Sequence, residues 1–181
     1  MQKLIPGVGT NLITSNGHPA FGGVYKLAAI KAKEDQDFVP KIKLSENVEK
    51  VTNPGNKTIY RIYDKETGKI RADLICLADE VFDPEEDMII FDPMATWKKT
   101  KITGGTYTLR ELLIPVFLKG ECVYTSPSVM EIREICKKEK ETLWDETLRL
   151  VNPQEVYVDL SDKLFKIKSN LLEEMGKAAI E

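Results

Sequence analysis

The chain has 181 residues, of which 42% are apolar and 30% are charged, and its formal net charge is −3. This length and composition predict one ordinary globular domain, or one domain with an appendage. The weak negative charge argues against a nucleic-acid partner, and no apolar stretch is long enough to span a bilayer. The three cysteines lack metal-ligand spacing, which is typical of reduced thiols packed as small apolar groups in a cytoplasmic protein.

The first elements are predicted around a glycine-containing turn. Residues 6–15, PGVGTNLITS, predict a tight turn followed by a helical turn. The apolar run VYKLAAI (24–30) and the alternating run PKIKLS (40–45) are expected as strands on either side of a charged loop. A long polar connection with an Asn-Pro-Gly turn follows them.

A hairpin is predicted next, from TIYRIY (58–63) and IRADLICL (70–77). In its turn, Asp64 is expected to accept backbone hydrogen bonds and Gly68 to adopt a positive φ. DMIIFDP (87–93) predicts another short strand.

The middle of the chain predicts a loop and a second hairpin. Residues 98–108, KKTKITGGTYT, are expected as a loop, although their threonines could extend a strand. Residues 111–124 predict a hairpin around Lys119 and Gly120, with Pro115 at an edge or bulge because it offers no N–H.

The last third predicts two helices separated by a short strand. The first helix is expected to begin at Ser126 or at Ser128, the latter with Glu131 as a capping box, and to end at Asn152-Pro153. Its apolar positions, including Val129, share one face. EVYVDL then predicts the strand, and a final helix is expected to begin at Ser161 and to end near Gly176. The apolar stripe of that helix is formed by Leu164, Ile167, Leu171 and Met175.

Because the strands precede the helices, the order of elements indicates an α+β fold, with mixed, mainly antiparallel strands. Two tryptophans, Trp97 and Trp144, are interpreted as packing residues. The acidic run at 79–87 is interpreted as a solvated loop.

The glycine turn is the first candidate binding site. Gly7 and Gly9 let backbone N–H groups approach a ligand, a helical turn behind them adds partial positive charge, and Thr10 adds a hydroxyl. Together these groups would fit a phosphate monoester. The alternative is a tight turn without a ligand, because short glycine patterns are weak signals.

The lysines of the following segment are the second candidate. Lys41, Lys43, Lys50 and Lys57 lie in and beside the long polar connection, and lysines suit phosphates as point charges. The alternative is an ordinary solvated surface. The single histidine, His18, is interpreted as an exposed loop residue, and no motif of a metal site or a catalytic triad is present.

Several motifs in series resemble the C-terminal portion of nicotinate phosphoribosyltransferases. They are GVGTNLITS, FGGVYKLAAI, PKIKLSENVEKVTNPGNK with YRIYD, and later ELLIPVF, GECVYTSPSVMEIRE and EVYVDLSDKLFKIK. Their order and approximate spacing also match, and the resemblance covers nearly the whole chain.

The resemblance implies a reaction that joins nicotinate to phosphoribosyl pyrophosphate, giving nicotinate mononucleotide and pyrophosphate in NAD salvage. In this family ATP hydrolysis is coupled through a phosphorylated histidine, and Mg²⁺ is used. By resemblance, Gly7 shapes the turn that holds the 5′-phosphate, and Val8, Gly9 and Thr10 contact that phosphate. Lys43, Lys50 and Lys57 match basic positions near phosphate-bearing substrates.

The resemblance also implies two parts: residues 1–30 as the end of the family's irregular α/β barrel, and residues 31–181 as a C-terminal α+β extension. The phosphorylated histidine and the nicotinate-binding arginine of the family lie upstream of the turn, so no catalytic residue and no metal ligand is assigned here. Pro6 stands where the family has phenylalanine. The chain is therefore expected to be a fragment or a split-gene product that is inactive without the N-terminal part.

Two interpretations follow from different classes of protein. In the first, the chain works together with the N-terminal part of the enzyme. In the second, it is a non-catalytic domain that binds a phosphorylated ligand, a partner protein or a homodimer mate. Exposed apolar side chains in VYKLAAI (24–30) would favour the first. A decayed, inactive gene product is a third possibility.

Overall fold

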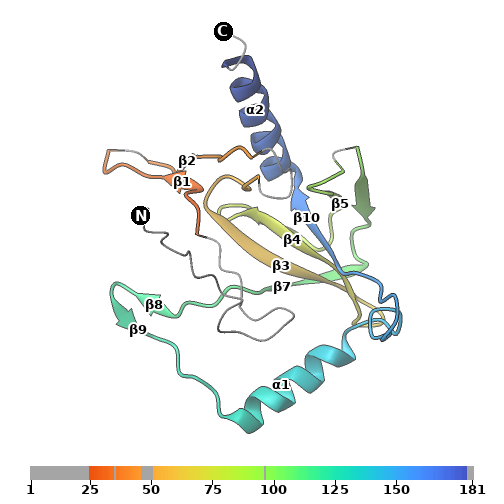
Figure 1. Cartoon of the computed structure of the whole chain (residues 1–181). Coiled ribbons are helices and arrows are strands. Elements are labelled where there is room, and N and C mark those ends of the chain that lie inside the picture. The colour runs from red at the N-terminus through yellow and green to blue at the C-terminus, as the bar shows by residue number, and fades with distance from the viewer. Residues whose placement is uncertain (1–24, 35, 46–50, 96, 179–181) are drawn as a thin grey trace, which may run out of the picture.

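The computed structural model describes residues 25–34, 36–45, 51–95 and 97–178 (Figure 1). Six strands form one mixed sheet in the order β6-β5-β10-β4-β3-β7, in which β10 is parallel to β4 and the other neighbours are antiparallel. Two ribbons, β1-β2 and β8-β9, lie outside this sheet. The sheet and two helices confirm the α+β class.

The strands are β1 (Ala29–Ile30), β2 (Val39–Pro40), β3 (Lys57–Asp64), β4 (Ile70–Leu77), β5 (Met88–Phe91), β6 (Lys99–Ile102), β7 (Tyr107–Glu111), β8 (Phe117–Leu118), β9 (Glu121–Cys122) and β10 (Tyr157–Ser161), and the helices are α1 (Val129–Glu141) and α2 (Asp162–Ala178).

The main sheet curls around its own core. Its two edge strands, β6 and β7, are joined by only the four residues 103–106, so the two edges must lie close together. Every buried residue of the larger apolar cluster comes from a strand of this sheet. The curled sheet therefore encloses a core without help from a helix. The cluster contains Ile62, Ala72, Leu74, Cys76, Met88, Ile90, Ile102 and Tyr107.

Helix α2 covers one end of the outer face of the sheet. Leu164 of α2 packs with Leu77 and Leu160, and the rings of Phe91 and Phe165 stack with centroids 4.4 Å apart. The predicted start is confirmed, because Ser161 Oγ accepts a hydrogen bond from the N–H of Leu164 at 3.2 Å. The predicted end near Gly176 is close to the observed one, since the helix continues to Ala178. In the described part of the chain, neither helix has the length and apolar character that a membrane span requires.

Both predicted hairpins are present. Asp64 Oδ1 accepts hydrogen bonds from the N–H groups of Glu66 and Thr67, at 3.2 and 2.8 Å, and Gly68 has φ +68°. In the second hairpin, Lys119 and Gly120 have φ values of 51° and 88° between β8 and β9. Pro115 precedes that ribbon, outside the strands.

Two predicted strands are shorter than expected. Among residues 25–30 only the two residues of β1 belong to a strand, and in the run 40–45 only Pro40 does. Backbone hydrogen bonds next to the ribbon β1-β2 join the two runs at one further position and also reach the loop 51–56. Ala28 O, for example, accepts from the N–H groups of Lys41 and Gly55 at 2.8 and 2.7 Å.

Of the two alternatives for residues 98–108, the loop is wrong and the strand is confirmed, because the segment forms β6, the start of β7 and the turn between them. Gly104 has no room for a side chain, since a Cβ there would lie 2.2 Å from Glu85 O, and Gly105 has φ +74°. The paired glycines therefore mark the turn between β6 and β7.

Helix α1 begins as predicted but ends earlier. Ser128 and Glu131 form the expected capping box. The expected end at Asn152 is wrong: the helix ends at Glu141, and Thr142 is its C-cap. The N–H of Ile70 donates to Thr142 O at 2.8 Å, so the β3-β4 hairpin takes the place of the next helical turn.

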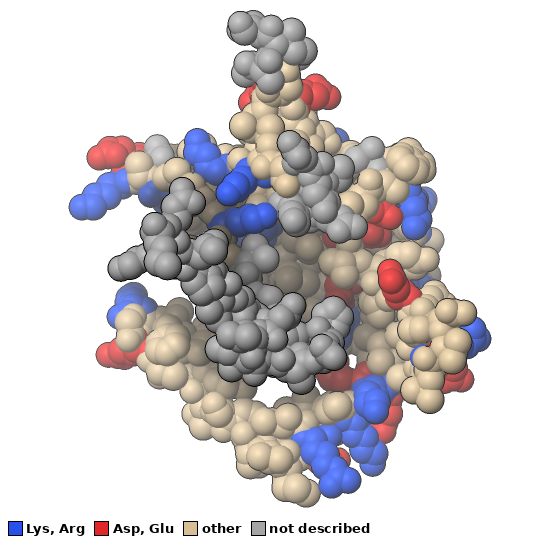
Figure 2. Space-filling view, viewed as in Figure 1, with Lys and Arg blue, Asp and Glu red and all other residues tan. Residues whose placement is uncertain are grey.

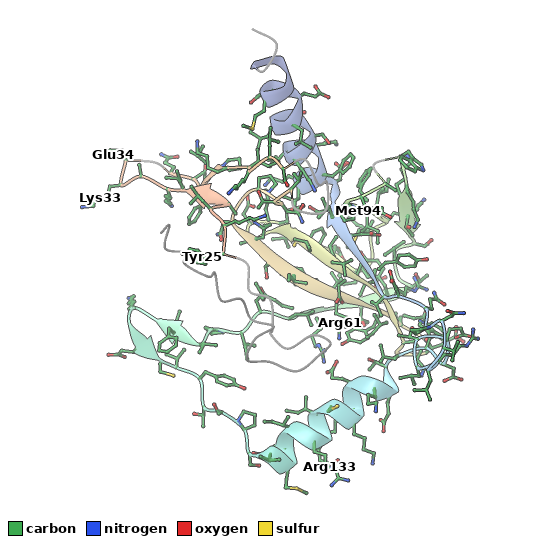
Figure 3. All side chains as sticks on the ribbon, viewed as in Figure 1. Tyr25, Lys33, Glu34, Arg61, Met94 and Arg133 are labelled. Atoms are coloured by element: carbon green, nitrogen blue, oxygen red, sulfur yellow. The ribbon has the colours of Figure 1, made fainter. Side chains whose placement is uncertain are left out.

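A row of charged side chains ties α1 to the sheet. Arg61 on β3 lies directly opposite Asp73 on β4 and Arg110 on β7. Arg61 binds Asp73 through two hydrogen bonds of 2.7 and 2.8 Å. Glu139 of α1 accepts two bonds from Arg110, at 2.7 and 2.9 Å, and one from Arg61 at 3.4 Å. Figure 3 shows Arg61 between β3 and α1. Glu139 thereby offsets the repulsion between two neighbouring arginines.

Some expectations about packing are corrected. Trp97 is 84% exposed, so it is not a packing residue, whereas Trp144 donates its indole N–H to Ile70 O at 2.7 Å. Of the three free cysteines, Cys76 is buried in the core, but Cys122 and Cys136 are exposed.

Cys76 should be protected from alkylation in the folded protein. Burial raises the pKa of its thiol to about 12. In iodoacetamide at neutral pH we expect Cys122 and Cys136 to react at least ~100-fold faster than Cys76. Mass spectrometry of timed samples measures the three rates, and concentrated guanidinium chloride should remove the difference. Equal labelling of the folded protein would contradict the buried position of Cys76.

Glu139→Gln should loosen the attachment of α1. The substitution removes the charge that lies between Arg61 and Arg110, and an exposed helix that opens more often is cleaved faster. Trypsin should then cleave after the lysines of α1 at least ~3-fold faster. The control is Glu134→Gln, on the outer side of the same helix, which should leave the rate unchanged. If both variants are cleaved alike, Glu139 does not hold the helix.

Candidate functional site

The predicted phosphate turn, residues 7–10, lies outside the described part of the chain. Lys50 and His18 lie outside it as well. The roles expected for Gly7, Val8, Gly9 and Thr10 therefore stay predictions.

Two other predicted phosphate contacts flank one loop, residues 51–56. Lys57 begins β3, and its Nζ donates to Gly55 O at 2.6 Å. Partial burial lowers the pKa of Lys57. Lys43 is exposed, and its backbone N–H donates to Thr52 Oγ1 at 2.9 Å. The fold thus brings both predicted lysines to the same loop.

A third lysine at this loop was missed by the sequence analysis. Lys168 of α2 is only 9% exposed, and its Nζ donates to Asn53 Oδ1 at 2.8 Å. Burial lowers the pKa of Lys168. One feature of the sequence could have predicted this burial. Lys168 follows Leu164 by four residues, so it lies beside the apolar stripe of the helix. Such a lysine has to be held by a specific partner, and here that partner is the loop.

These lysines make the loop a region that can attract an anion. An ammonium group carries three N–H donors. Within the described part of the chain, Lys57 and Lys168 each donate one hydrogen bond to a neutral oxygen, which leaves donors for a ligand. Among the described residues neither lysine belongs to an ion pair. Figure 2 shows basic side chains gathered beside β1 and β2, below α2. Partial desolvation strengthens the attraction of such groups to an oxyanion.

The conformation of the loop depends on Gly55. Its φ is +91°, and a Cβ at this position would lie 2.6 Å from Leu77 Cδ2. Pro54 beside it is fully buried. The Asn-Pro-Gly turn expected from the sequence is therefore a packed part of the fold, which fixes the segment that carries the lysines.

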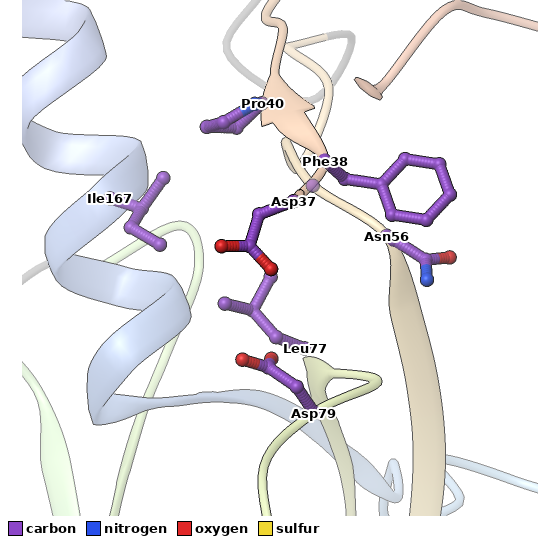
Figure 4. A pocket seen from close by; sticks show the side chains of 8 residues that line it. Asp37, Phe38, Pro40, Asn56, Leu77, Asp79 and Ile167 are labelled. Carbon is purple, nitrogen blue, oxygen red and sulfur yellow. The ribbon is translucent and has the colours of Figure 1, made fainter. Parts of the chain in front are cut away.

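The pocket on the other side of this loop does not suit a phosphate. It lies between β2, the start of β3 and α2, and Figure 4 shows the carboxylates of Asp37 and Asp79 pointing into it. Asp79 also binds Lys163 at 2.8 Å, and that hydrogen bond lowers the pKa of Asp79. Two carboxylates would repel a phosphate, so any anion site belongs to the lysine side of the loop.

The acidic run at 79–87 serves the fold. Tyr107 donates its hydroxyl to Asp83 O and Glu86 O, both at 3.1 Å, and Asp87 accepts from the N–H of Gly104 at 2.9 Å. The run thereby packs against the turn between β6 and β7, while its carboxylates stay largely exposed. In the described ranges, no three side chains of His, Cys, Asp or Glu are grouped so as to hold a metal ion.

Comparison with known proteins gives a consistent result. Residues 56–168 match the family model described as the nicotinate phosphoribosyltransferase C-terminal domain. Nicotinate phosphoribosyltransferase of Bacillus subtilis is 37% identical over 175 residues, which is 97% of this chain and 35% of the relative. The human enzyme of the same name is 30% identical over 166 residues, 91% of this chain and 29% of the relative.

The fold agrees with this result. The crystal structure of human nicotinic acid phosphoribosyltransferase superimposes with a TM-score of 0.56, at 23% identity, over 67% of this chain and 24% of that one. The chain spans about a third of the length of the relatives it matches, and it corresponds to their C-terminal portion. It belongs to the nicotinate phosphoribosyltransferase family, as a chain that contains the C-terminal domain of these enzymes.

Proposed function

We propose that this chain supplies the C-terminal part of a nicotinate phosphoribosyltransferase. The enzyme would join nicotinate to phosphoribosyl pyrophosphate and release nicotinate mononucleotide and pyrophosphate, with ATP hydrolysis. The observation that carries the proposal is the family match over residues 56–168, together with relatives of that name aligned over 88–97% of the chain.

The contribution of this chain to the chemistry would be positioning and charge. Residues 7–10 would hold the 5′-phosphate of the ribosyl group through backbone N–H groups and the Thr10 hydroxyl. Lys43, Lys50 and Lys57 would attract the phosphate-bearing substrates. The partial burial of Lys57 supports this role, because a less hydrated ammonium binds an oxyanion more strongly. Fixed positive charge of this kind stabilises a pyrophosphate leaving group without reorganisation.

ATP and Mg²⁺ are proposed to bind elsewhere in the enzyme. The described residues contain no group of three His, Cys, Asp or Glu side chains that could hold a metal ion without a substrate. The acidic pocket of Figure 4 does not fit a nucleotide phosphate either. We therefore assign no step of the reaction to a metal or nucleotide held by these residues.

The exposed start of the described chain favours this proposal over a self-contained binding module. Tyr25 is fully exposed, and Leu27 and Ile30 are 60% and 45% exposed. These side chains belong to the apolar run 24–30. Their exposure was expected if the run packs against the N-terminal part of the enzyme. A module that folds and acts alone would bury them.

A chimeric enzyme tests the proposal. In it, this chain replaces the matching C-terminal third of the Bacillus subtilis relative. We expect the chimera to form nicotinate mononucleotide from nicotinate, phosphoribosyl pyrophosphate, ATP and Mg²⁺. The 181-residue chain alone should form none, because the family's catalytic histidine and nicotinate-binding arginine lie upstream of the turn. A folded chimera without product would contradict the proposed role, and turnover by the chain alone would contradict its dependence on the remaining part.

Thr10→Ala in the chimera should weaken the binding of phosphoribosyl pyrophosphate. Loss of one hydrogen bond to a charged group costs about 1–2 kcal/mol, which raises the dissociation constant roughly 5- to 30-fold. Calorimetric titration measures the change, and Thr14→Ala, outside the turn, is the control. An unchanged dissociation constant for Thr10→Ala would remove this hydroxyl from the phosphate site.

A further inference from the structure

One large apolar surface of the molecule has no neighbour among the described residues. It is formed by residues 112–128, which include the ribbon β8-β9 and are called the arm, and by Val129, Ile132 and Ile135 of α1, and we call it the arm–helix surface. Exposed apolar patches of this extent mark interaction sites in soluble proteins. Figure 2 shows mostly neutral side chains over the arm and the N-terminal end of α1. Its most exposed apolar members include Ile114, Phe117, Leu118, Val129 and Ile132.

The apolar stripe of α1 points toward the sheet but does not reach it. Ile132 and Ile135 lie on the same side of the helix as Glu139, at helical spacings of seven and four residues. Glu139 contacts the sheet, yet both isoleucines are 51% exposed, and α1 contains no buried residue. Figure 1 shows the reason: from Glu141 back to Val129, α1 moves steadily away from the sheet.

This helix is nevertheless capped at its start and bonded to the sheet at its end. Its capping box fixes the start, and the end is bonded to the hairpin through Ile70, Trp144 and Lys69 Nζ, which donates to the carbonyls of Glu141 and Leu143 at 2.9 and 2.8 Å. An isolated helix of 13 residues is marginal in water, because most helical stability comes from packing an apolar face. The helix therefore presents an uncovered apolar stripe in a fixed conformation, which is a preorganised surface for binding another part of a protein.

We infer that the arm–helix surface docks on the catalytic portion that precedes this domain in the longer relatives; this inference rests on the proposed function. That portion makes up 65% of the Bacillus subtilis relative and 71% of the human one, since the chain covers 35% and 29% of them. It joins the domain through the N-terminal side of the chain. In Figure 3, Tyr25 lies between the β1-β2 ribbon above and the arm below.

The occupant is expected to present apolar side chains that fill the space between α1 and the sheet. The covalent connection keeps the preceding portion close to the arm–helix surface. The effective concentration of that portion at the surface therefore exceeds the concentration of a second copy. Because this apolar surface is already fixed in its conformation, it loses little conformational entropy when it binds.

Photocrosslinking in the chimera tests the inference. A photoreactive phenylalanine analogue replaces Ile132 in one variant and Met130 in a second. Met130 is the control, because it is exposed on the opposite side of α1. We expect illumination to link position 132, but not position 130, to peptides of the preceding portion of the same chain. Links only between copies, or no links at position 132, would overturn the inference.

A second pair of variants measures how much docking contributes to thermal stability. Ile132→Asp should lower the melting temperature of the chimera by about 2–4 °C, while Met130→Asp changes it by less than about 1 °C. In the 181-residue chain alone, both variants should melt within about 1 °C of the parent, because neither side chain is buried there. Equal effects of Ile132→Asp in the chimera and in the chain alone would contradict docking.

The outcomes separate this inference from the proposed function. Crosslinks from position 132 to the preceding portion in a chimera that forms no product would support docking and contradict the function. Product formation with crosslinks only between copies would support the function and overturn docking.

Discussion

The position of α1 depends on the register of three strands. Pairing of β3 with β4 and β7 sets Asp73, Arg61 and Arg110 side by side across the sheet. Two adjacent arginines need more than one carboxylate, and Glu139 of α1 supplies the second. A one-residue slip would turn these side chains to the other face and release the helix. In the described part of the chain, the arm follows β7 at one end and leads into α1 at the other, so its placement follows from the same register.

The curled sheet provides a stable base for this arrangement. The four-residue connection 103–106 brings the edge strands β6 and β7 together, so the apolar cluster is closed by strands alone. Helix α2 covers the outer face at one end, and α1 is tied to the outer side at the other. The domain therefore has a complete core of its own together with an apolar surface that no described residue covers. This combination is expected of a domain that works as part of a larger enzyme.

Local signals predicted the local structure well. The Asp64 turn, the Ser128 capping box and the helix start at Ser161 each follow from residues within four positions of one another. Features that depend on distant partners were not predicted. The parallel pairing of β10 with β4 and the end of α1 at Glu141 rest on contacts across about 70 residues or more. The burial of Lys168 against Asn53 is of the same kind, so the basic loop was only partly recognised. The phosphate turn at 7–10 stays a prediction.

The most direct test of the account compares backbone hydrogen exchange in the 181-residue chain and in the chimera. The central claim is that the main sheet is complete in the chain alone, whereas the arm–helix surface is completed by the preceding portion of the enzyme. We predict that amides in the first two turns of α1 exchange at least ~10-fold more slowly in the chimera, and that those of β3 and β4 change little. Equal exchange of α1 in both proteins, with the fold of each intact, would contradict the account.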